Sequence, residues 1–492
     1  MRHFSRMKTA KSDNMGLHRD LLEVRCSMRR FKIILFLMAF GFMIYAGGAS
    51  NLPFKCMLKS CLASLSDSKP RTGSESTTTP AVNNLNIKPE ALSKYPYDGP
   101  APGIPLLQWT RIPGSVFYEI ELLTREPENP NGISPSVYQY YSSRNVFTNG
   151  YSIDLSSYSG SHLYWRVRAL NWDGTPIGVF SDAAPLYMDH NLTQVLKPVS
   201  NTGYREANMP MPLYPVYSWL PVYGAVQYEV ELTDAPPENP DGISPSRHQL
   251  RMLTVKGAFE CYDEEALSEP GTYYWRVRGL DERGEPVGVF SDPEEFTVSL
   301  EAGSYAATMG DSITHGGGAI SYSPADCEYS YQTYLSFPTM NLAFSGDTTE
   351  TMLKRFESDV LPFHPRYLII MDGINSLRAD VPASDVIEDL AAIRDQCLLN
   401  DIRPVFLTLP PINPENIQRT FKQGTVPDWQ EKLADVNDFI RKQPYCIDIE
   451  PYFVGPDRKL SSHWGIDGIH LDIEGKELMA RIIDDNWERV TR

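Results

Sequence analysis

The sequence predicts a multidomain protein with two all-β sandwich repeats followed by an α/β domain. The chain has 492 residues, which is too many for one compact core and enough for about three domains. Three separate blocks of sequence recur at an offset of 110 residues, which indicates an internal duplication. Beyond Ser304, short apolar runs alternate with amphipathic stretches, as strands alternate with helices in α/β domains.

The composition excludes several classes of protein. With 42% hydrophobic and 22% charged residues, the chain is neither wholly disordered, nor collagen-like, nor a polytopic membrane protein. A net charge of −17 argues against a nucleic-acid partner, because nucleic-acid binding requires a basic face. Seven cysteines are too few for a disulfide scaffold, and their spacing fixes no pairing and matches no zinc site.

The N-terminal segment has the order of a secretory signal. Residues 1–32 hold nine Lys or Arg and three Asp or Glu, and an uncharged apolar run from Ile33 to Ala46 follows. Small residues come next, so cleavage after Ala49 would complete a signal peptide, and Met28 is an alternative start. The rival interpretation is an uncleaved signal anchor, for which a spanning helix requires about 20 apolar residues. Both interpretations place the rest of the chain outside the cytoplasm.

The duplicated region predicts strands. The repeated blocks are Pro127–Ser136, Tyr164–Arg168 and Gly178–Asp182, which recur as Pro237–Ser246, Tyr274–Arg278 and Gly288–Asp292. Within each copy, Tyr118 to Leu122 and Tyr228 to Leu232 alternate apolar and acidic residues, the period of a strand with one buried face. Several short strands within about 100 residues predict a β-sandwich for each copy.

At these residues the repeats resemble bacterial fibronectin type III-like modules. The resemblance rests on an early tryptophan (Trp109, Trp219) and a Tyr-x-x-x-Leu strand. It rests also on Tyr-Trp-Arg-Val-Arg before a polar turn. It implies spacer or adhesion domains, with cell-surface or glycan contact as a candidate role. Trp165 and Trp275 are predicted to be core residues, and a sugar-binding platform is the alternative.

The C-terminal region predicts an α/β sheet with helices on both faces. Three apolar runs predict buried parallel strands, at Tyr305–Met309, Tyr367–Met371 and Pro404–Leu409. Four amphipathic stretches predict helices, at Thr349–Val360, Ala383–Asn400, Asp428–Arg441 and Ile473–Trp487. In such folds the functional site lies beyond the carboxyl ends of the strands.

Four polar blocks follow the expected strands. Ser312 lies in Gly-Asp-Ser-Ile-Thr at the end of the first strand. Gly346, in the loop after a short strand, could offer a bare backbone N–H, and Asn375 offers a neutral side-chain donor suited to an oxyanion. Asp467 and His470 precede the last helix, at a spacing that lets an aspartate orient an imidazole. Alone, each block also fits an ordinary turn or helix cap.

Together, in this order, the four blocks resemble the SGNH (GDSL) hydrolase family over roughly residues 304–488. The resemblance implies a flavodoxin-like three-layer domain with about five parallel strands. It implies Ser312 as nucleophile, His470 as general base and Asp467 as the residue that orients the imidazole, with the oxyanion hole formed by the Ser312 amide, Gly346 and Asn375. The implied reaction proceeds through an acyl-enzyme and needs no metal or organic cofactor. Ser376 stands where the family often has aspartate, a departure that concerns the local loop geometry.

The predicted organisation therefore has five parts. They are a basic N-terminus with signal peptide or anchor (1–50), a Ser/Thr/Pro-rich linker (51–95), two fibronectin type III-like repeats (96–190 and 205–299) and an SGNH/GDSL hydrolase domain (300–492). The predicted function is an extracytoplasmic serine esterase, secreted, periplasmic or held at the cell surface, with acetyl esters on polysaccharide as candidate substrates. The alternatives are a lipid or thioester acyl hydrolase, and a non-catalytic adhesion or scaffold protein. His315 and His463 are expected to be polar loop residues.

Overall fold

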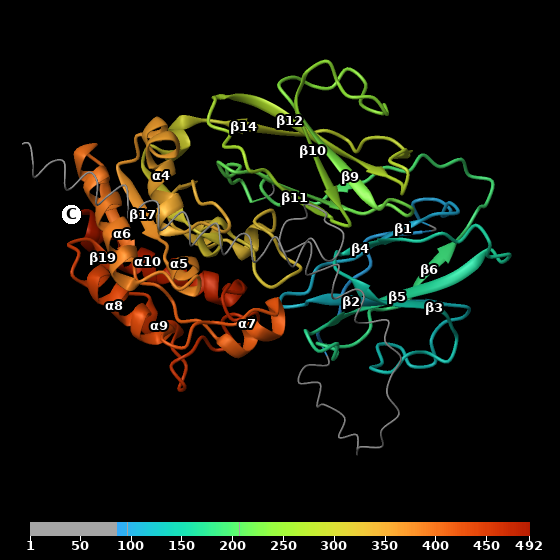
Figure 1. The fold of residues 1–492 in the computed structure, drawn as a ribbon. Helices are drawn as coiled ribbons and strands as arrows, with labels where there is room; N and C mark the ends of the chain where they lie inside the picture. Colours follow the sequence, from blue (N-terminus) through green and yellow to red (C-terminus); the bar gives the residue numbers. More distant parts are fainter. Residues whose placement is uncertain (1–85, 96, 206) are drawn as a thin grey trace, which may run out of the picture. The chain divides into compact units, whose positions relative to one another are not determined.

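The computed structural model describes residues 86–492 apart from 96 and 206 (Figure 1). These residues belong to one compact unit of the chain, Pro53–Arg492. The predicted signal or anchor and most of the predicted linker lie outside the described residues. Within the described part, no helix is long and apolar enough to cross a membrane. Two cysteines in this part, Cys397 and Cys446, are free thiols.

Each repeat folds as two antiparallel sheets. In the first repeat, β1 (Leu106–Gln108) pairs with β4 (Gly150–Ser152). The second sheet has the order β3-β2-β5-β6, formed by β2 (Phe117–Leu123), β3 (Gln139–Val146), β5 (His162–Leu170) and β6 (Ala184–Tyr187). The core of this repeat lies between the two sheets and contains Leu107, Ile120 and Val167.

The second repeat has the same arrangement at the predicted offset. One sheet has the order β11-β8-β7, formed by β7 (Val199–Ser200), β8 (Val216–Leu220) and β11 (Glu260–Tyr262). The other has the order β10-β9-β12, with two further strands on β12, and is formed by β9 (Gln227–Thr233), β10 (Gln249–Lys256), β12 (Gly271–Leu280), β13 (Pro286–Val287) and β14 (Glu294–Val298). The duplication is therefore structural as well as sequential. The resemblance to fibronectin type III modules remains a prediction.

The repeated blocks meet in one buried polar network. In the first repeat, Arg166 Nε donates to Glu121 Oε2 over 2.8 Å, and Nη1 donates to the Asn129 carbonyl over 3.1 Å. The same guanidinium lies 4.0 Å from the centre of the Phe180 ring. The corresponding residues of the second repeat, Arg276, Glu231, Asn239 and Phe290, form the same contacts. The expectation of a strand with one buried face is thus corrected, since the arginines and the blocks around them bury the acidic face as well.

The tryptophans of the repeats are core residues. Trp165 is 0% exposed and Trp275 is 1% exposed. The Trp165 ring lies 6.2 Å from the ring of Trp109, and the Trp275 ring lies 5.1 Å from that of Tyr217. The prediction of core packing is confirmed, and the sugar-platform alternative is wrong for these two residues.

The C-terminal region contains a five-stranded parallel sheet of order β16-β15-β17-β18-β19. The strands are β15 (Ala306–Gly310), β16 (Met340–Asn341), β17 (Tyr367–Met371), β18 (Arg403–Leu407) and β19 (Cys446–Ile447). Nearly all their residues are buried, which explains the continuous apolar runs in the sequence. This order is the flavodoxin-like order that the resemblance implied.

Helices cover the sheet. The helical elements are η1 (Leu300–Gly303), α3 (Ser312–His315), η2 (Cys327–Tyr329), η3 (Tyr331–Tyr334), α4 (Thr349–Asp359), η4 (Leu361–Phe363), α5 (Ile374–Arg378), α6 (Ala383–Leu399), α7 (Pro414–Phe421), α8 (Trp429–Arg441), α9 (Glu450–Phe453) and α10 (Ile473–Thr491). Helices α4, α6 and α8 pack side by side, whereas α10 packs on β19 and η3. Because parallel crossovers are right-handed, the change of direction at β15 puts these two groups on opposite faces. The four predicted helices are confirmed, and α7 was not predicted.

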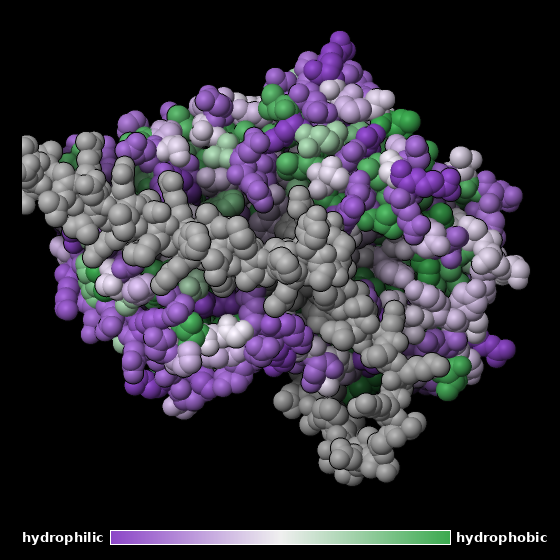
Figure 2. All heavy atoms as spheres, viewed as in Figure 1, coloured by the Kyte–Doolittle hydropathy of each residue, from purple (hydrophilic) through white to green (hydrophobic). Residues whose placement is uncertain are grey.

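Exposed hydrophobic side chains are scattered over the repeats. Val137, Ile243 and Leu250 are examples. Figure 2 shows mostly hydrophilic side chains over the region of α7, α8 and α9, and more hydrophobic ones among the strands of the repeats. Single exposed apolar residues are normal on soluble proteins, so they mark no site by themselves.

The segment between α3 and β16 contacts both repeats. The Tyr322 hydroxyl lies 2.7 Å from Ser115 Oγ of the first repeat, and the Gly203 N–H of the region before the second donates to the Ala325 carbonyl over 2.9 Å. Arg111 forms an ion pair with Asp326 of this segment. The repeats therefore make specific polar contacts with the C-terminal domain.

Candidate active site

Three of the predicted site residues form one hydrogen-bonded chain. Ser312 Oγ lies 2.8 Å from His470 Nε2, and His470 Nδ1 lies 2.7 Å from Asp467 Oδ2. His470 is 5% exposed and Asp467 is 1% exposed, whereas Ser312 is half-buried. The arrangement is that of a nucleophile, a base and the group that orients the base.

The turn that carries Asp467 and His470 is closed by the Asp467 carboxylate. Its Oδ1 accepts the backbone N–H groups of Ile469 and His470, each over 2.8 Å. Gly468, which follows Asp467, has φ +89°, and a Cβ at this residue would lie 2.5 Å from the Asn413 carbonyl oxygen. Glycine is therefore required at this position, and the Asp-Gly turn serves the site directly.

The hydrogen bonds assign the protons on the imidazole. The carboxylate of Asp467 is an acceptor, so His470 Nδ1 carries a proton, and Nε2 of the neutral ring accepts the Ser312 hydroxyl proton. Burial would raise the pKa of Asp467, but the electrostatic interaction with the His470 ring and the hydrogen bonds from that ring and from two backbone N–H groups hold the pKa below its ordinary value. Asp467 therefore stays ionised, as its predicted role requires.

The nucleophile position is set by the end of β15. Ser312 is the first residue of α3, and Asp311 before it caps the helix by accepting the Ile313 N–H over 2.9 Å. Gly310 approaches the neighbouring strand so closely that a Cβ would lie 2.1 Å from the Met371 carbonyl oxygen. Asp311 therefore braces the turn between β15 and α3.

The predicted oxyanion donors follow the two strands that flank β15: Gly346 lies on the loop after β16, and Asn375 lies in α5, which follows β17. Asn375 Nδ2 donates to the Asp347 carbonyl over 2.9 Å, which uses one of its two N–H bonds. Gly346 has φ +99°, is exposed, and has no atom within 4 Å of where a Cβ would be. The sheet changes direction at β15, and sites of α/β sheets lie at such a switch point. The structure does not test the roles of Gly346 and Asn375, which stay predictions.

The serine that departs from the family pattern has a structural partner. Ser376 Oγ accepts the Thr349 N–H over 3.1 Å at the beginning of α4. Thr349 Oγ1 in turn donates to Asp389 Oδ2 of α6 over 2.8 Å. Hydroxyl groups therefore tie α5 and α6 to the first residue of α4.

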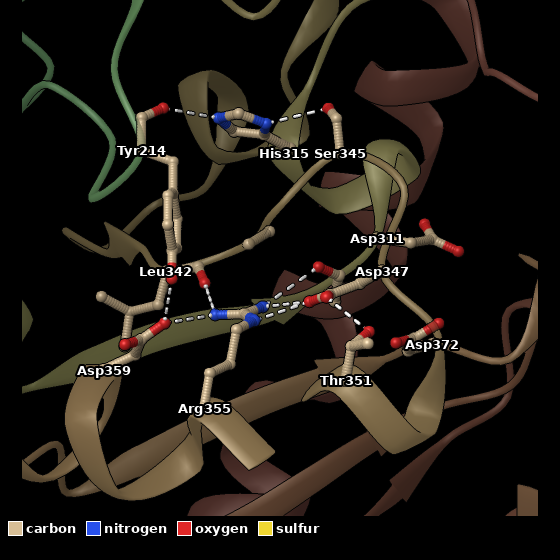
Figure 3. Close-up of polar contacts among 12 residues, drawn as sticks. Tyr214, Asp311, His315, Leu342, Ser345, Asp347, Thr351, Arg355, Asp359 and Asp372 are labelled. Atoms are coloured by element: carbon tan, nitrogen blue, oxygen red, sulfur yellow. Dashed lines mark hydrogen bonds and ion pairs between the residues drawn. The ribbon is translucent and has the colours of Figure 1, made fainter. Parts of the chain in front are cut away.

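An arginine that sequence reasoning missed holds the loop of Gly346 (Figure 3). Arg355 Nε donates to Asp347 Oδ2 over 2.6 Å, and Nη1 donates to the Leu342 carbonyl over 2.6 Å and to Asp359 Oδ2 over 2.9 Å. Both ends of the segment 342–347 are thereby attached to α4. The Arg-x-x-x-Asp spacing on a predicted helix was the only signal in the sequence, and it did not reveal the loop contacts.

Two buried carboxyl groups lie near the nucleophile. Burial raises the pKa of Asp311 to about 7. Burial also raises the pKa of Asp372 well above its ordinary value, and the charge of Asp311 adds to this shift. Among the described residues, no group of three or more His, Cys, Asp or Glu side chains is arranged to hold a metal ion.

His315 differs from its expected place. It was predicted to be a polar loop residue, but it ends α3 and is 2% exposed. Its ring contacts Ser345 Oγ through Nδ1 and the Tyr214 carbonyl through Nε2, each over 2.9 Å. His463 lies in an exposed turn, as expected.

Comparisons with known proteins identify the class of this domain. Residues 308–478, about a third of the chain, match the model of the GDSL-like Lipase/Acylhydrolase family. This part of the chain is therefore a GDSL-like lipase/acylhydrolase domain, and its class of activity is the hydrolysis of ester bonds. A comparison with curated proteins found no match.

Solved structures similar to this chain include three enzymes. A GDSL-like lipase from Bacteroides thetaiotaomicron is 19% identical with a TM-score of 0.30, over 37% of this chain and 87% of that one. A lipase/acylhydrolase from Enterococcus faecalis is 21% identical with a TM-score of 0.30, over 37% and 95%. An acetyl-xylooligosaccharide esterase from Geobacillus Stearmophilus is 17% identical with a TM-score of 0.28, over 39% and 97%.

Proposed function

We propose that the protein is an extracytoplasmic serine esterase that hydrolyses carboxylic esters through an acyl-enzyme on Ser312. The observation that carries the proposal is the unbroken chain from Ser312 Oγ through His470 to Asp467, with links of 2.8 and 2.7 Å. A serine hydroxyl is a weak nucleophile unless a base adjoins it, and His470 Nε2 is placed to be that base.

The proposed reaction has two halves. His470 Nε2 takes the Ser312 proton as Oγ attacks the ester carbonyl, and it then gives the proton to the leaving alcohol. Water attacks the resulting acyl-Ser312 with His470 again accepting the proton, which releases the acid and restores the serine. In both halves the carbonyl oxygen becomes an oxyanion, which the N–H groups of Ser312 and Gly346 and the second N–H of Asn375 would stabilise.

For substrate we propose acyl groups on polysaccharide, acetyl esters in particular. The proposal rests on the N-terminal sequence, which has the order of an export signal, and on the tandem β-sandwiches, which suit a protein that works at a surface. The sequence of residues 304–488 has no long apolar insertion that could line a groove for a long acyl chain, which supports a short acyl group. A lipid or thioester acyl hydrolase is the alternative.

Labelling of the nucleophile and kinetics with a short aryl ester test the proposed reaction. A fluorophosphonate probe is expected to label the parent protein and to leave Ser312→Ala unlabelled. The kcat/KM for an aryl acetate is expected to fall by on the order of 10⁴-fold or more in Ser312→Ala and in His470→Ala. Parent-like kinetics in either variant would contradict the mechanism, and an unlabelled, inactive parent would indicate the scaffold alternative.

A substrate series distinguishes the acyl classes. We expect acetyl esters of polysaccharide and of aryl alcohols to be hydrolysed, and kcat/KM to fall as the acyl chain lengthens. A rise in kcat/KM with chain length would favour the lipid alternative. Export is tested separately, by locating the full-length protein and sequencing its mature N-terminus.

A further inference from the structure

The second repeat contacts the strand that leads to the oxyanion loop, residues 342–347. Leu213, before β8, donates its N–H to the Asn341 carbonyl of β16 over 2.9 Å. Leu213 and Tyr214 are buried in the hydrophobic core of the C-terminal domain. The Tyr214 ring lies 4.7 Å from the ring of Phe344, which is itself in the oxyanion loop. A segment that precedes the α/β domain by about 100 residues in sequence therefore covers the edge strand of its sheet.

The Tyr214 side chain is held at its far end. Its hydroxyl donates to Asp359 Oδ2 over 2.7 Å, and the Arg355 guanidinium lies 5.6 Å from the centre of its ring. Asp359 and Arg355 belong to α4, and Arg355 also binds Asp347. Figure 3 shows Tyr214 standing between α4 and His315. The main chain of Tyr214 is thus fixed against the C-terminal domain.

His315 connects the main chain of Tyr214 to Ser345 in the oxyanion loop. The Tyr214 carbonyl can only accept a hydrogen bond, so His315 Nε2 must carry a proton. Nδ1 of the neutral ring then accepts the Ser345 hydroxyl proton. The Tyr262 ring of the second repeat lies 6.2 Å from the imidazole at a steep angle. The imidazole therefore bridges the second repeat and the residue immediately before Gly346.

Gly346 depends on its neighbours for its position. It has no side chain, and no atom lies within 4 Å of where a Cβ would be. On one side Asp347 is held by Arg355 and Asn375, and on the other Ser345 is held by His315. An oxyanion donor is useful only within hydrogen-bond distance of the developing charge, and a displacement of about 1 Å can cost on the order of 10²-fold in rate.

We propose that the second repeat is a part of the catalytic machinery, because it positions the Gly346 donor through the chain Tyr214–His315–Ser345. The three are positioning residues, since none of them contacts the reacting atoms. The proposal rests on the ester hydrolysis proposed above, and it makes the β-sandwich more than a spacer. Its consequence is that rate, rather than substrate binding, depends on a contact between two domains.

Point variants of the full-length chain test the proposal with an aryl acetate as substrate. Ser345→Ala removes the bond to His315, and we expect kcat to fall by about 10-fold with KM nearly unchanged, because the oxyanion exists only in the transition state. Ser345→Thr retains the hydroxyl and is expected to restore most of kcat. Tyr214→Phe loses only the anchor on Asp359, so a smaller fall in kcat is expected.

A double-mutant cycle tests whether the residues act together. Ser345→Ala and His315→Ala remove the same bond, so the double variant is expected to be no slower than His315→Ala alone. Tyr322→Phe is the matched control, because it breaks a buried contact of the C-terminal domain with the first repeat instead of the second. Its kcat is expected to equal that of the parent. If His315→Ala does not fold, Ser345→Ala and Ser345→Thr decide the question.

The outcomes separate this proposal from the proposed function. Parent-like kcat in Ser345→Ala, or fully additive losses in the cycle, would overturn the positioning role while Ser312→Ala remained inactive. A loss confined to KM would also overturn it, because a displaced oxyanion donor acts on kcat. If the parent is no faster than Ser312→Ala, the esterase function fails, and the positioning role fails with it.

Discussion

Strands β1 and β8 correspond to each other in the two repeats. The repeats differ at the two residues that shortly precede these strands. The first repeat has Gly103 and Ile104 there, and the second has Leu213 and Tyr214, at the common offset of 110. The backbone is used alike, since Gly103 and Leu213 each accept a main-chain N–H from their own repeat over 2.8 Å. Only Leu213 and Tyr214 enter the core of the hydrolase domain, whereas Ile104 is half-buried.

This difference shows what a duplication preserves and what it leaves free. The buried Arg–Glu–Phe network is the same in both copies because each sandwich needs it to close its acidic face. The residues before β1 and β8 are not part of this network. In the second repeat these residues have large side chains, which pack into the core of the C-terminal domain. A repeated module can therefore be a support in one position and a part of an active site in the next.

Exchange of these two residues is expected to have the largest effect. Leu213→Gly with Tyr214→Ile makes the second repeat resemble the first. Each large buried side chain that is reduced costs about 2–5 kcal/mol of unfolding free energy, and kcat falls as well if the oxyanion loop moves. The reverse change Ile104→Tyr is the control, with expected losses below about 1 kcal/mol. Urea unfolding and aryl acetate kinetics measure both, and equal effects at the two sites would contradict the asymmetry.

Because the two repeats share the buried Arg–Glu–Phe network, loss of the arginine is expected to lower the unfolding free energy equally in both. Arg166→Met leaves Glu121 buried without its cation, and Arg276→Met does the same to Glu231. Removal of one partner from a buried ion pair costs about 3–5 kcal/mol. Denaturant unfolding of each variant should therefore give similar losses. A large loss in only one repeat would show that the network is equivalent in geometry but not in energy.

The predicted oxyanion donor Asn375, which belongs to the hydrolase domain, sharpens the comparison further. Asn375 lies on α5, and its side chain contacts the Asp347 carbonyl. Asn375→Ala is expected to lower kcat by on the order of 10²-fold with little change in KM. The loss should persist when Ser345→Ala is present, because the predicted role of this amide is a direct hydrogen bond to the oxyanion. A change in KM alone would instead assign Asn375 to substrate binding.

Local patterns in the sequence predicted three of the five strands and the four long helices. The three members of the hydrogen-bonded chain followed from the order of the four polar blocks and the family that this order resembles, since each block alone also fits an ordinary turn. Continuous apolar runs mark buried strands, and Gly-Asp-Ser or Asp-x-x-His is a compact motif. Helix α7 was missed because it has only eight residues, although Asn413 and Pro414 are a recognisable helix start.

The contacts of His315 could not be predicted in the same way. Its partners are Ser345 and Tyr214, which are 30 and 101 residues away in sequence. No periodicity or spacing records a contact between a turn before one domain and a loop of another. An isolated histidine after the nucleophile therefore resembled an ordinary polar loop residue until the fold placed it.

The last prediction concerns the pH dependence of stability at Asp472, near a contact with the first repeat. Asp472, at the beginning of α10, accepts the Ile466 N–H over 2.9 Å, and burial raises its pKa from 3.8 to about 7. Its charge acts on Tyr329, whose hydroxyl accepts the Gly114 N–H of the first repeat. Because the folded pKa lies above the unfolded one, the stabilising contribution is complete below about pH 4 and is lost as pH rises to about 7.

Asp472→Asn tests this linkage, since asparagine retains the acceptor and stays neutral. The unfolding free energy of the variant should therefore fall less than that of the parent between about pH 4 and about pH 7, the two ends of the window set by the unfolded and folded pKa values. Asp435→Asn, at an exposed position, makes the same change in charge and should leave the parent's pH dependence unaltered. Identical pH profiles for Asp472→Asn and the parent would show that this carboxyl ionises normally in the folded protein. Ser345 contacts the second repeat through His315. If Ser345→Ala also reduced the pH dependence of stability, the assignment of this dependence to Asp472, near the first repeat, would be contradicted.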